Sequence, residues 1–181
     1  MAGVTRLPRE WSHAGLEAVG FEGFVPLAAL GRSEAPKNPG IYIVLREGQA
    51  QAEFLPRSIA GHFKGVDSTV ERAVLEAAWI PDTSVLYIGK ARWGIKRDGL
   101  RRRLSQYRRH GAGRAVGHRG GEYIWQVAGS EAFLVCWKVV DDEAVDQFEA
   151  DLIDAFEFEH GRWPFANRKH ERRRGTTPPV A

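Results

Sequence analysis

The sequence is poor in cysteine and has no long apolar run, and both absences limit what the protein can be. Cys136 is the only cysteine among 181 residues, so no disulfide forms within one chain. No stretch of about 18 apolar residues predicts a transmembrane helix. The first residues lack the apolar segment of a signal peptide. We therefore expect a cytoplasmic protein that makes no contact with a membrane.

Acidic residues are almost absent from one stretch of an otherwise balanced chain. The formal net charge is only +3, yet Asp98 is the only acid between Lys90 and Arg119, a stretch crowded with lysine and arginine. A second basic cluster follows at 168–174, whereas acids gather at 141–159. A basic surface on a protein of low net charge favours binding of a polyanion. The alternative is a solvated helix face.

Hydrophobic patterning predicts three strands with helices between them. The strands are expected at 41–45, 85–89 and 132–140, and a further short strand running into a helical turn at 23–30. Helices are expected at three places: from a capping box formed by Ser68 and Glu71 to about Trp79, from 98 or 99 onward, and from 141 onward. This order predicts an α+β domain with a small sheet.

Five short segments stand out on these predicted elements. Gly-Ile-Tyr at 40–42 and Tyr-Ile-Gly at 87–89 lie on the first two strands. The arginine-rich helix at 100–107 has leucine, arginine, leucine and tyrosine at regular spacing, a helix at 148–153 carries a glutamate, and Pro-Phe-Ala-Asn forms a turn at 164–167. In this order the five segments resemble the GIY-YIG nuclease family.

The resemblance covers residues 38–169 and implies a three-stranded antiparallel sheet flanked by helices. It leaves 1–37 as an N-terminal extension packed on the domain, and 170–181 as a basic, flexible tail. Members of the family usually join the two triplets by a tight loop. Here an insertion at 46–84, with a helix inside it, lies between the first two strands, and such a long connection costs little loop entropy.

The resemblance also implies a metal-dependent nuclease. Glu149 is then the ligand of Mg²⁺ or Mn²⁺, because magnesium keeps several waters and needs few protein ligands. Arg103 is in phase with Leu100, Leu104 and Tyr107, and its guanidinium suits a bidentate grip on the scissile phosphate. Without the resemblance, Glu149 would be interpreted as an exposed helix residue and Arg103 as part of a surface ion pair.

Two tyrosines are candidates for activating the attacking water. Tyr42 and Tyr87 lie on adjacent predicted strands, and a phenol becomes a base only where a cation lowers its pKa. Lys90, directly after the second triplet, is expected to do so. Which tyrosine relays the proton is left open by the sequence, and Asn167 is expected to support the catalytic group. Either tyrosine is alternatively a strand aromatic packed against a helix.

Other basic residues are candidates for contacts with the nucleic-acid backbone. Arg101 and Arg102 fall on other faces of the arginine-rich helix than Arg103. The full set of predicted nucleic-acid-binding residues is Arg101, Arg102, Arg108, Arg109 and His118. The alternative for each is an ordinary surface residue. Trp125 and Cys136 are interpreted as core residues.

These observations give a first hypothesis and two rivals. The first is a DNA endonuclease with a one-metal mechanism, with RNA left open as substrate. Because no further DNA-reading domain is evident, its sequence specificity is limited or comes from a protein partner. The rivals are a catalytically silent nucleic-acid-binding module, and a toxin or anti-phage effector that uses the same chemistry.

Overall fold

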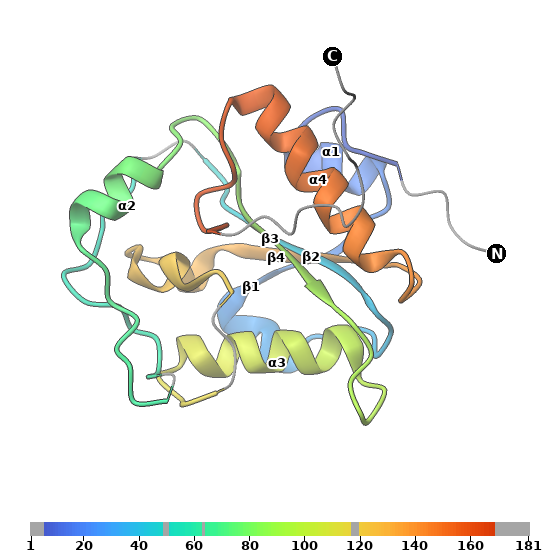
Figure 1. The fold of residues 1–181 in the computed structure, drawn as a ribbon, viewed down its shortest axis with the longest axis horizontal. Coiled ribbons are helices and arrows are strands. Elements are labelled where there is room, and N and C mark those ends of the chain that lie inside the picture. Colours follow the sequence, from blue (N-terminus) through green and yellow to red (C-terminus); the bar gives the residue numbers. More distant parts are fainter. Residues whose placement is uncertain (1–5, 49–50, 63, 117–119, 169–181) are drawn as a thin grey trace, which may run out of the picture.

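The structure is a computed structural model that describes residues 6–48, 51–62, 64–116 and 120–168. Figure 1 shows a twisted sheet between helices. The strands are β1 Glu22–Pro26, β2 Gly40–Leu45, β3 Val85–Ala91 and β4 Leu134–Val139. The helices are α1 His13–Ala18, α2 Arg72–Ala78, α3 Gly99–Gly111 and α4 Val145–His160. Short 3₁₀ helices are η1 Leu27–Arg32, η2 Glu122–Gln126 and η3 Ser130–Ala132.

The sheet has four strands rather than the three that the sequence predicted. Their order is β1-β4-β2-β3, and every neighbouring pair is antiparallel. The additional strand is β1, which we expected to be a strand but did not place in the sheet. A break in register between Glu22 and Val25 interrupts it, and Phe24 has a positive φ of 49°. The irregularity hides the two-residue alternation by which sheet strands are found in a sequence. The segment predicted as an extension therefore completes the sheet.

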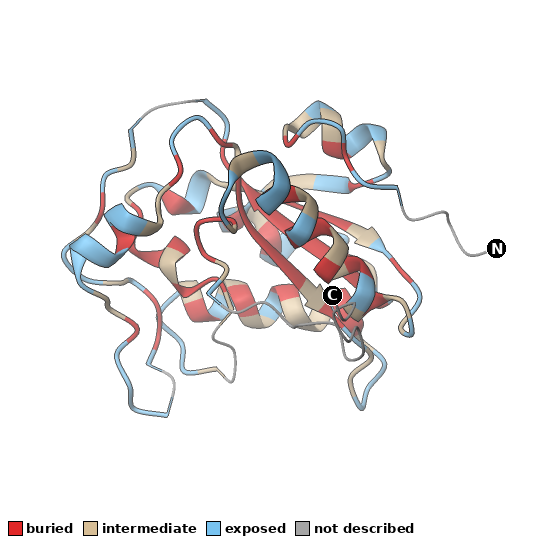
Figure 2. Cartoon of the chain, turned by 45° about the horizontal axis from the view of Figure 1, so that its top comes forward, coloured by how far each residue is buried: buried red, intermediate tan, exposed pale blue. Residues whose placement is uncertain are grey.

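Helices α3 and α4 cover opposite faces of the sheet (Figure 1). Successive strand residues point to opposite sides, so Tyr42 and Val44 pack with α3, whereas Ile41 and Ile43 pack with α4. We call these the α3 face and the α4 face. Figure 2 shows β2 and β3 almost wholly buried, whereas β1 and the outer sides of the helices are largely exposed. The central strand β2 is buried along its whole length.

Helix α2, within the insertion, is shorter than predicted. It begins at Arg72 rather than Ser68, and Glu71 makes no side-chain capping bond. The reason is a tertiary contact: the buried amide of Gln126 accepts from the N–H of Val70 at 3.0 Å and donates to its carbonyl at 2.9 Å. Both backbone groups of Val70 are therefore hydrogen-bonded to a side chain, and α2 begins about one turn later than predicted.

Most other elements lie where the sequence predicted them. Helix α3 begins at Gly99 as expected, and α4 begins at Val145, after a turn at 141–144 in place of the predicted first turn. No helix in the described ranges has the length and apolar character needed to cross a membrane. The predicted tail at 170–181 lies outside the described residues.

Candidate active site

Asn167 closes the outer edge of β3, the strand at one side of the sheet. Its side-chain oxygen accepts from the N–H of Ile88 at 2.9 Å, and its side-chain nitrogen donates to the Ile88 carbonyl at 2.8 Å. The N–H of Ala166 donates to the carbonyl of Leu86 at 2.8 Å. The predicted turn at 164–167 thus acts as a short partner strand. It fixes the backbone between Tyr87 and Gly89, although Asn167 lies far away in sequence.

Two tyrosines meet over Gly89 on the α3 face. Tyr42 lies opposite Gly89 in the pairing of β2 with β3, and the rings of Tyr42 and Tyr87 have centroids 5.8 Å apart. A Cβ atom at Gly89 would lie 2.7 Å from an atom of each ring, so the close approach requires glycine. Tyr107 of α3 completes the cluster, with its ring 6.0 Å from that of Tyr42. All three side chains are buried.

The environment gives the two phenols unequal acidity. Burial raises the pKa of Tyr42 to about 12, while the positive charge of Arg103 acts in the opposite direction. Burial also raises the pKa of Tyr87 well above its ordinary value. A hydrogen bond between the two phenols lowers the pKa of Tyr42 and raises that of Tyr87. Tyr42 is the phenol on which the positive charge of Arg103 acts, and that charge favours its ionised form.

Three consecutive arginines of α3 point in three directions. The charge of Arg103 acts on Tyr42, which places it on the tyrosine side of the helix. Arg102 instead forms an ion pair with Asp98 at 3.0 Å, one turn earlier. The Nε of Arg101 donates to the carbonyl of Ala35 at 2.9 Å. Only Arg103 among the three belongs to the cluster, as its phase on the helix predicted.

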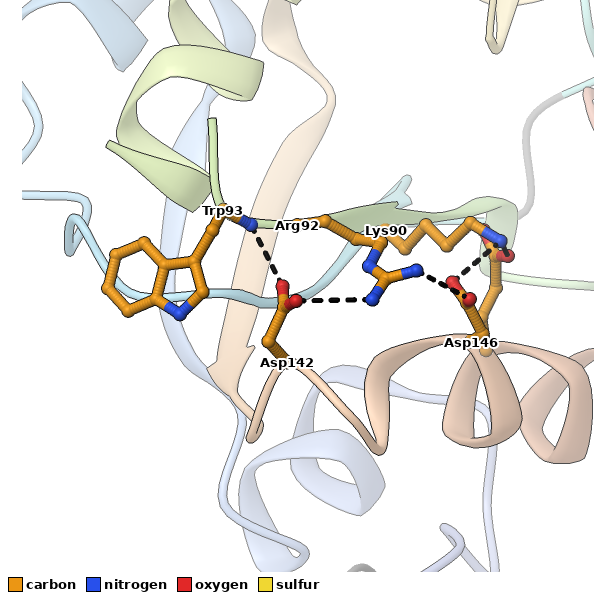
Figure 3. A network of polar contacts seen from close by, with 6 residues as sticks. Lys90, Arg92, Trp93, Asp142 and Asp146 are labelled. Atoms are coloured by element: carbon orange, nitrogen blue, oxygen red, sulfur yellow. Dashed lines mark hydrogen bonds and ion pairs between the residues drawn. The ribbon is translucent and has the colours of Figure 1, made fainter. Parts of the chain in front are cut away.

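Lys90 and Glu149 lie on the other side of β3, in a network of charges. The Nζ of Lys90 is 3.0 Å from Oε2 of Glu149 and 3.2 Å from Oδ1 of Asp146. Arg92 forms ion pairs with Asp142 at 3.1 Å and with Asp146 at 3.0 Å (Figure 3). The network fastens the end of β3 to the start of α4 and holds Glu149 at the edge of the sheet.

The structure assigns Lys90 a different partner from the one the sequence suggested. Lys90 pairs across β2 with Ile41, a residue of the α4 face, whereas Tyr87 lies on the α3 face. The odd spacing of Tyr87 and Lys90 along one strand turns their side chains to opposite faces. Arg103, rather than Lys90, is the cation that lowers the pKa of Tyr42.

The remaining predicted nucleic-acid-binding residues are spread around α3. Arg109 is exposed, whereas Arg108 is partly buried against Gly31. His118 lies outside the described residues. Trp125 is a core residue, as expected, with its ring 4.8 Å from that of Tyr107.

Sequence reasoning missed a buried carboxylate beside the tyrosines. Glu122 is only 2% exposed and forms an ion pair with Arg168 at 2.7 Å. It follows Gly121, whose carbonyl accepts from the hydroxyl of Tyr107 at 3.4 Å. A single acid after a glycine-rich loop carries no sequence signal of burial, because its partner is supplied from the far end of the domain.

Glu149 is the residue at this edge that the sequence predicted as a metal ligand. The described residues contain no group of three or more His, Cys, Asp and Glu side chains able to hold a metal ion. Glu149 retains some exposure, and its carboxylate already faces the ammonium of Lys90. Because the ammonium repels a second cation, a metal ion at Glu149 requires Lys90 to move toward Asp146, its other partner. Mg²⁺ binds through one or two carboxylates and keeps several waters, so Glu149 then suffices as the protein ligand.

No family model matches the chain, and the searches of curated proteins and of solved structures gave no match either. The residues and their geometry therefore carry the functional argument alone. What they bring together is a buried pair of phenols, a guanidinium, and a carboxylate whose charge acts on both phenols. These groups can bind a phosphate, move a proton and hold a cation.

Proposed function

We propose that this protein is a metal-dependent endonuclease that hydrolyses phosphodiester bonds in DNA. One observation carries the proposal: the rings of Tyr42 of β2 and Tyr87 of β3 lie 5.8 Å apart over Gly89, where the charges of Arg103 of α3 and Glu149 of α4 act on Tyr42. Four elements thus supply one site. Together they provide the phosphate contact, the proton acceptor and the cation ligand that phosphodiester hydrolysis requires.

The chain's own residues divide the reaction among them. Arg103 contacts the scissile phosphate and offsets the negative charge that grows in the transition state. Burial keeps both phenols protonated near neutral pH, so they transfer a proton rather than act as standing bases. Tyr42 is the phenol proposed to carry the transient anion, because the positive charge of Arg103 acts on it.

Glu149 is the proposed ligand for Mg²⁺ or Mn²⁺. A divalent ion bound there polarises the phosphate and lowers the pKa of a bound water. Lys90 is shared between Glu149 and Asp146. Asp146 therefore offers the ammonium a second partner when Glu149 binds a cation, so that Lys90 is not left without a counter-ion.

Incubation of the purified protein with supercoiled plasmid tests the proposal. We expect nicking with Mg²⁺ or Mn²⁺, none with EDTA, and loss of nicking in Glu149→Gln and Arg103→Ala. Removal of one group that stabilises a transition-state charge costs on the order of 100- to 1,000-fold in rate. Two matched controls should cut normally: Glu159→Gln on the exposed side of α4, and Arg72→Ala on the exposed surface of α2. Arg109→Ala removes a predicted backbone contact on the exposed side of α3 and should lose less activity than Arg103→Ala.

The controls also separate the rival interpretations. Plasmid binding without cutting in every divalent metal would contradict the proposal and favour a silent binding module. Equal loss of activity in Arg109→Ala and Arg103→Ala would mean that total charge matters and that the position of Arg103 does not. Cutting by Glu149→Gln at the rate of the wild type would remove the proposed metal ligand.

A further inference from the structure

A second basic site lies on the side of α3 turned away from the tyrosines. A groove of about 320 Å³ runs between η1 and α3. Its polar lining consists mainly of Ser33, Glu34, Arg101, Ser105 and Arg108, with Gly31 on the wall opposite α3. The groove is separate from the cluster of Tyr42, Arg103 and Glu149, none of which lines it.

Helical geometry explains why the groove collects two arginines. Arg101 and Arg108 are seven residues apart, so they stand above one another two turns apart along the same side of α3. Arg103 lies roughly 160° around the helix from Arg101 at about 100° per residue. The arginine-rich helix therefore presents one guanidinium to the tyrosine cluster and two to the groove.

Arg108 is held in place by the wall of the groove at Gly31. A Cβ atom at Gly31 would lie 3.1 Å from Nε of Arg108 and 3.3 Å from its Cζ, so the missing side chain of Gly31 makes room for the guanidinium. The Nε atom is buried and has no hydrogen-bond partner within the described part of the chain. A buried, charged donor without an acceptor is costly unless a ligand supplies one.

Arg101 is also positioned and lacks a carboxylate partner. Its Nε donates to the carbonyl of Ala35, which fixes the side chain and leaves its two terminal nitrogens for another acceptor. Neither Arg101 nor Arg108 forms an ion pair with an acid of the described ranges, although Arg102 on the same helix does. Glu34 lines the groove without pairing with either arginine.

We infer that this groove binds a phosphate group of a nucleic-acid strand, as a second anchor apart from the scissile phosphate. The guanidinium group matches a phosphate by two parallel hydrogen bonds, and the hydroxyl of Ser105 lies in the same lining. The choice of a nucleic-acid strand rests on the proposed function. The positions of the two arginines, the space at Gly31 and the buried Nε of Arg108 do not depend on the proposed function.

Binding of a labelled single-stranded DNA oligonucleotide in EDTA tests this inference without any cutting. We expect Arg108→Ala and Arg101→Ala each to weaken binding roughly tenfold, the effect of one lost hydrogen bond to a charged group. The slope of log K against log salt should fall by about 0.7 for one lost phosphate contact on a single strand. Arg72→Ala, which removes the same charge from the exposed surface of α2, should change both much less.

Gly31→Ala separates the shape of the groove from its charge. The added methyl group would lie 3.1 Å from Nε of Arg108, so the guanidinium must shift by a few tenths of an ångström while every charge stays in place, and Gly31 does not need a positive φ. We expect Gly31→Ala to weaken binding, but by less than Arg108→Ala does. Glu34→Gln should strengthen binding, because it removes the only negative charge in the lining. Thermal unfolding of each variant confirms that it is folded.

Several outcomes would contradict the proposal that the groove binds a phosphate group of a nucleic-acid strand. These are equal binding by Arg108→Ala and Arg72→Ala, wild-type affinity in Gly31→Ala, or no DNA binding by the wild type. Inorganic phosphate distinguishes a strand from a free anion: displacement of the oligonucleotide by micromolar phosphate would contradict the assignment to nucleic acid, and we expect none. If the wild type cuts plasmid and Arg108→Ala binds DNA as tightly as the wild type, the groove proposal fails and the nuclease proposal stands. If Arg108→Ala binds DNA more weakly and the wild type does not cut plasmid, the groove proposal stands and the nuclease proposal fails.

Discussion

The two faces of the sheet are built from adjacent residues of the same strands, yet they differ in chemistry. On the α3 face, Tyr42 and Tyr87 bury hydroxyl groups beside Tyr107 and near the charge of Arg103. The α4 face is lined by aliphatic and phenylalanine side chains. They include Ile41, Ile43, Ile88, Phe148 and Phe156. A shift of one residue along β2 therefore changes a proposed catalytic position into a core position.

The difference shows where stability and chemistry are placed in this fold. Burying an aliphatic or phenylalanine side chain stabilises by about 1.5–3 kcal/mol, and the interior of the α4 face is built mainly from such side chains, while its charged pair of Lys90 and Glu149 lies at the edge of the sheet. The α3 face holds phenols whose ionised form is disfavoured by burial. At the free edge of β3 the two faces meet, and there Glu149 and Asn167 join the tyrosines.

The largest expected effect separates the two faces by stability. Phe156→Ala should lower the free energy of unfolding by about 3–5 kcal/mol, because it empties a fully buried position on the α4 face. Phe156 also packs edge-on against Trp11, with ring centroids 5.1 Å apart. Urea unfolding measures the loss. Below the unfolding transition, the cutting rate per folded molecule should stay as in the wild type; a rate that falls in step with stability would break the division between the faces.

Alkaline pH is expected to have a smaller effect on the free energy of unfolding, and this effect depends on Tyr42. Folding raises its pKa from 10.0 to about 12, so the folded state holds this proton more tightly than the unfolded chain. The stabilisation is fully present below pH 10 and is lost as the pH rises through about 12. Tyr42→Phe should lack this loss, which amounts to about 2–3 kcal/mol for a shift of this size.

Urea unfolding of both proteins between about pH 9 and about pH 12 measures this loss of stability. The range includes the pKa of Tyr42 in the unfolded chain and most of its titration in the folded state. The comparison with Tyr42→Phe is needed because burial also raises the pKa of Cys136, on the α4 face, so that residue contributes in the same direction. Parallel curves for the two proteins would show that Tyr42 is not held in its protonated form by the fold.

A third prediction concerns the free edge where the faces meet. Asn167→Ala removes two hydrogen bonds to the backbone of Ile88 and should cost about 1–2 kcal/mol in stability. Cutting should fall by more than this loss explains, because the backbone that carries Tyr87 is no longer fixed. Asn38→Ala, at an exposed loop position, serves as control. Loss of stability with unchanged cutting would make Asn167 a purely structural residue.

Local patterns predicted much of the fold and part of the site. Runs of β-branched, aromatic and other apolar residues located β2, β3 and β4, and helical phase placed Arg103 with Leu100 and Leu104. These features depend only on the composition or the period of one element, which the sequence carries directly. The alternation of side chains along a strand, applied to the spacing of Tyr87 and Lys90, would have placed Lys90 on the α4 face. That inference was available in the sequence and was missed.

Other features depend on contacts between distant segments and could not be predicted locally. Strand β1 joins the sheet only because β4 offers an edge, and its bulge conceals the pattern. The start of α2 is set by Gln126, and Glu122 is buried because Arg168 pairs with it. No property of these segments by themselves indicates such partners.

The most direct test of the central claim compares two phenols of the α3 face. Tyr42→Phe and Tyr107→Phe each remove one hydroxyl from a buried ring of the same cluster, so they match in size and burial. The measurement is the rate of plasmid nicking with Mg²⁺ at neutral pH. The account predicts that Tyr42→Phe loses about 100- to 10,000-fold, the usual contribution of a positioned proton-transfer group, whereas Tyr107→Phe stays near the wild type. Equal rates for the two variants would contradict a catalytic role for Tyr42 and leave the tyrosine cluster as part of the core.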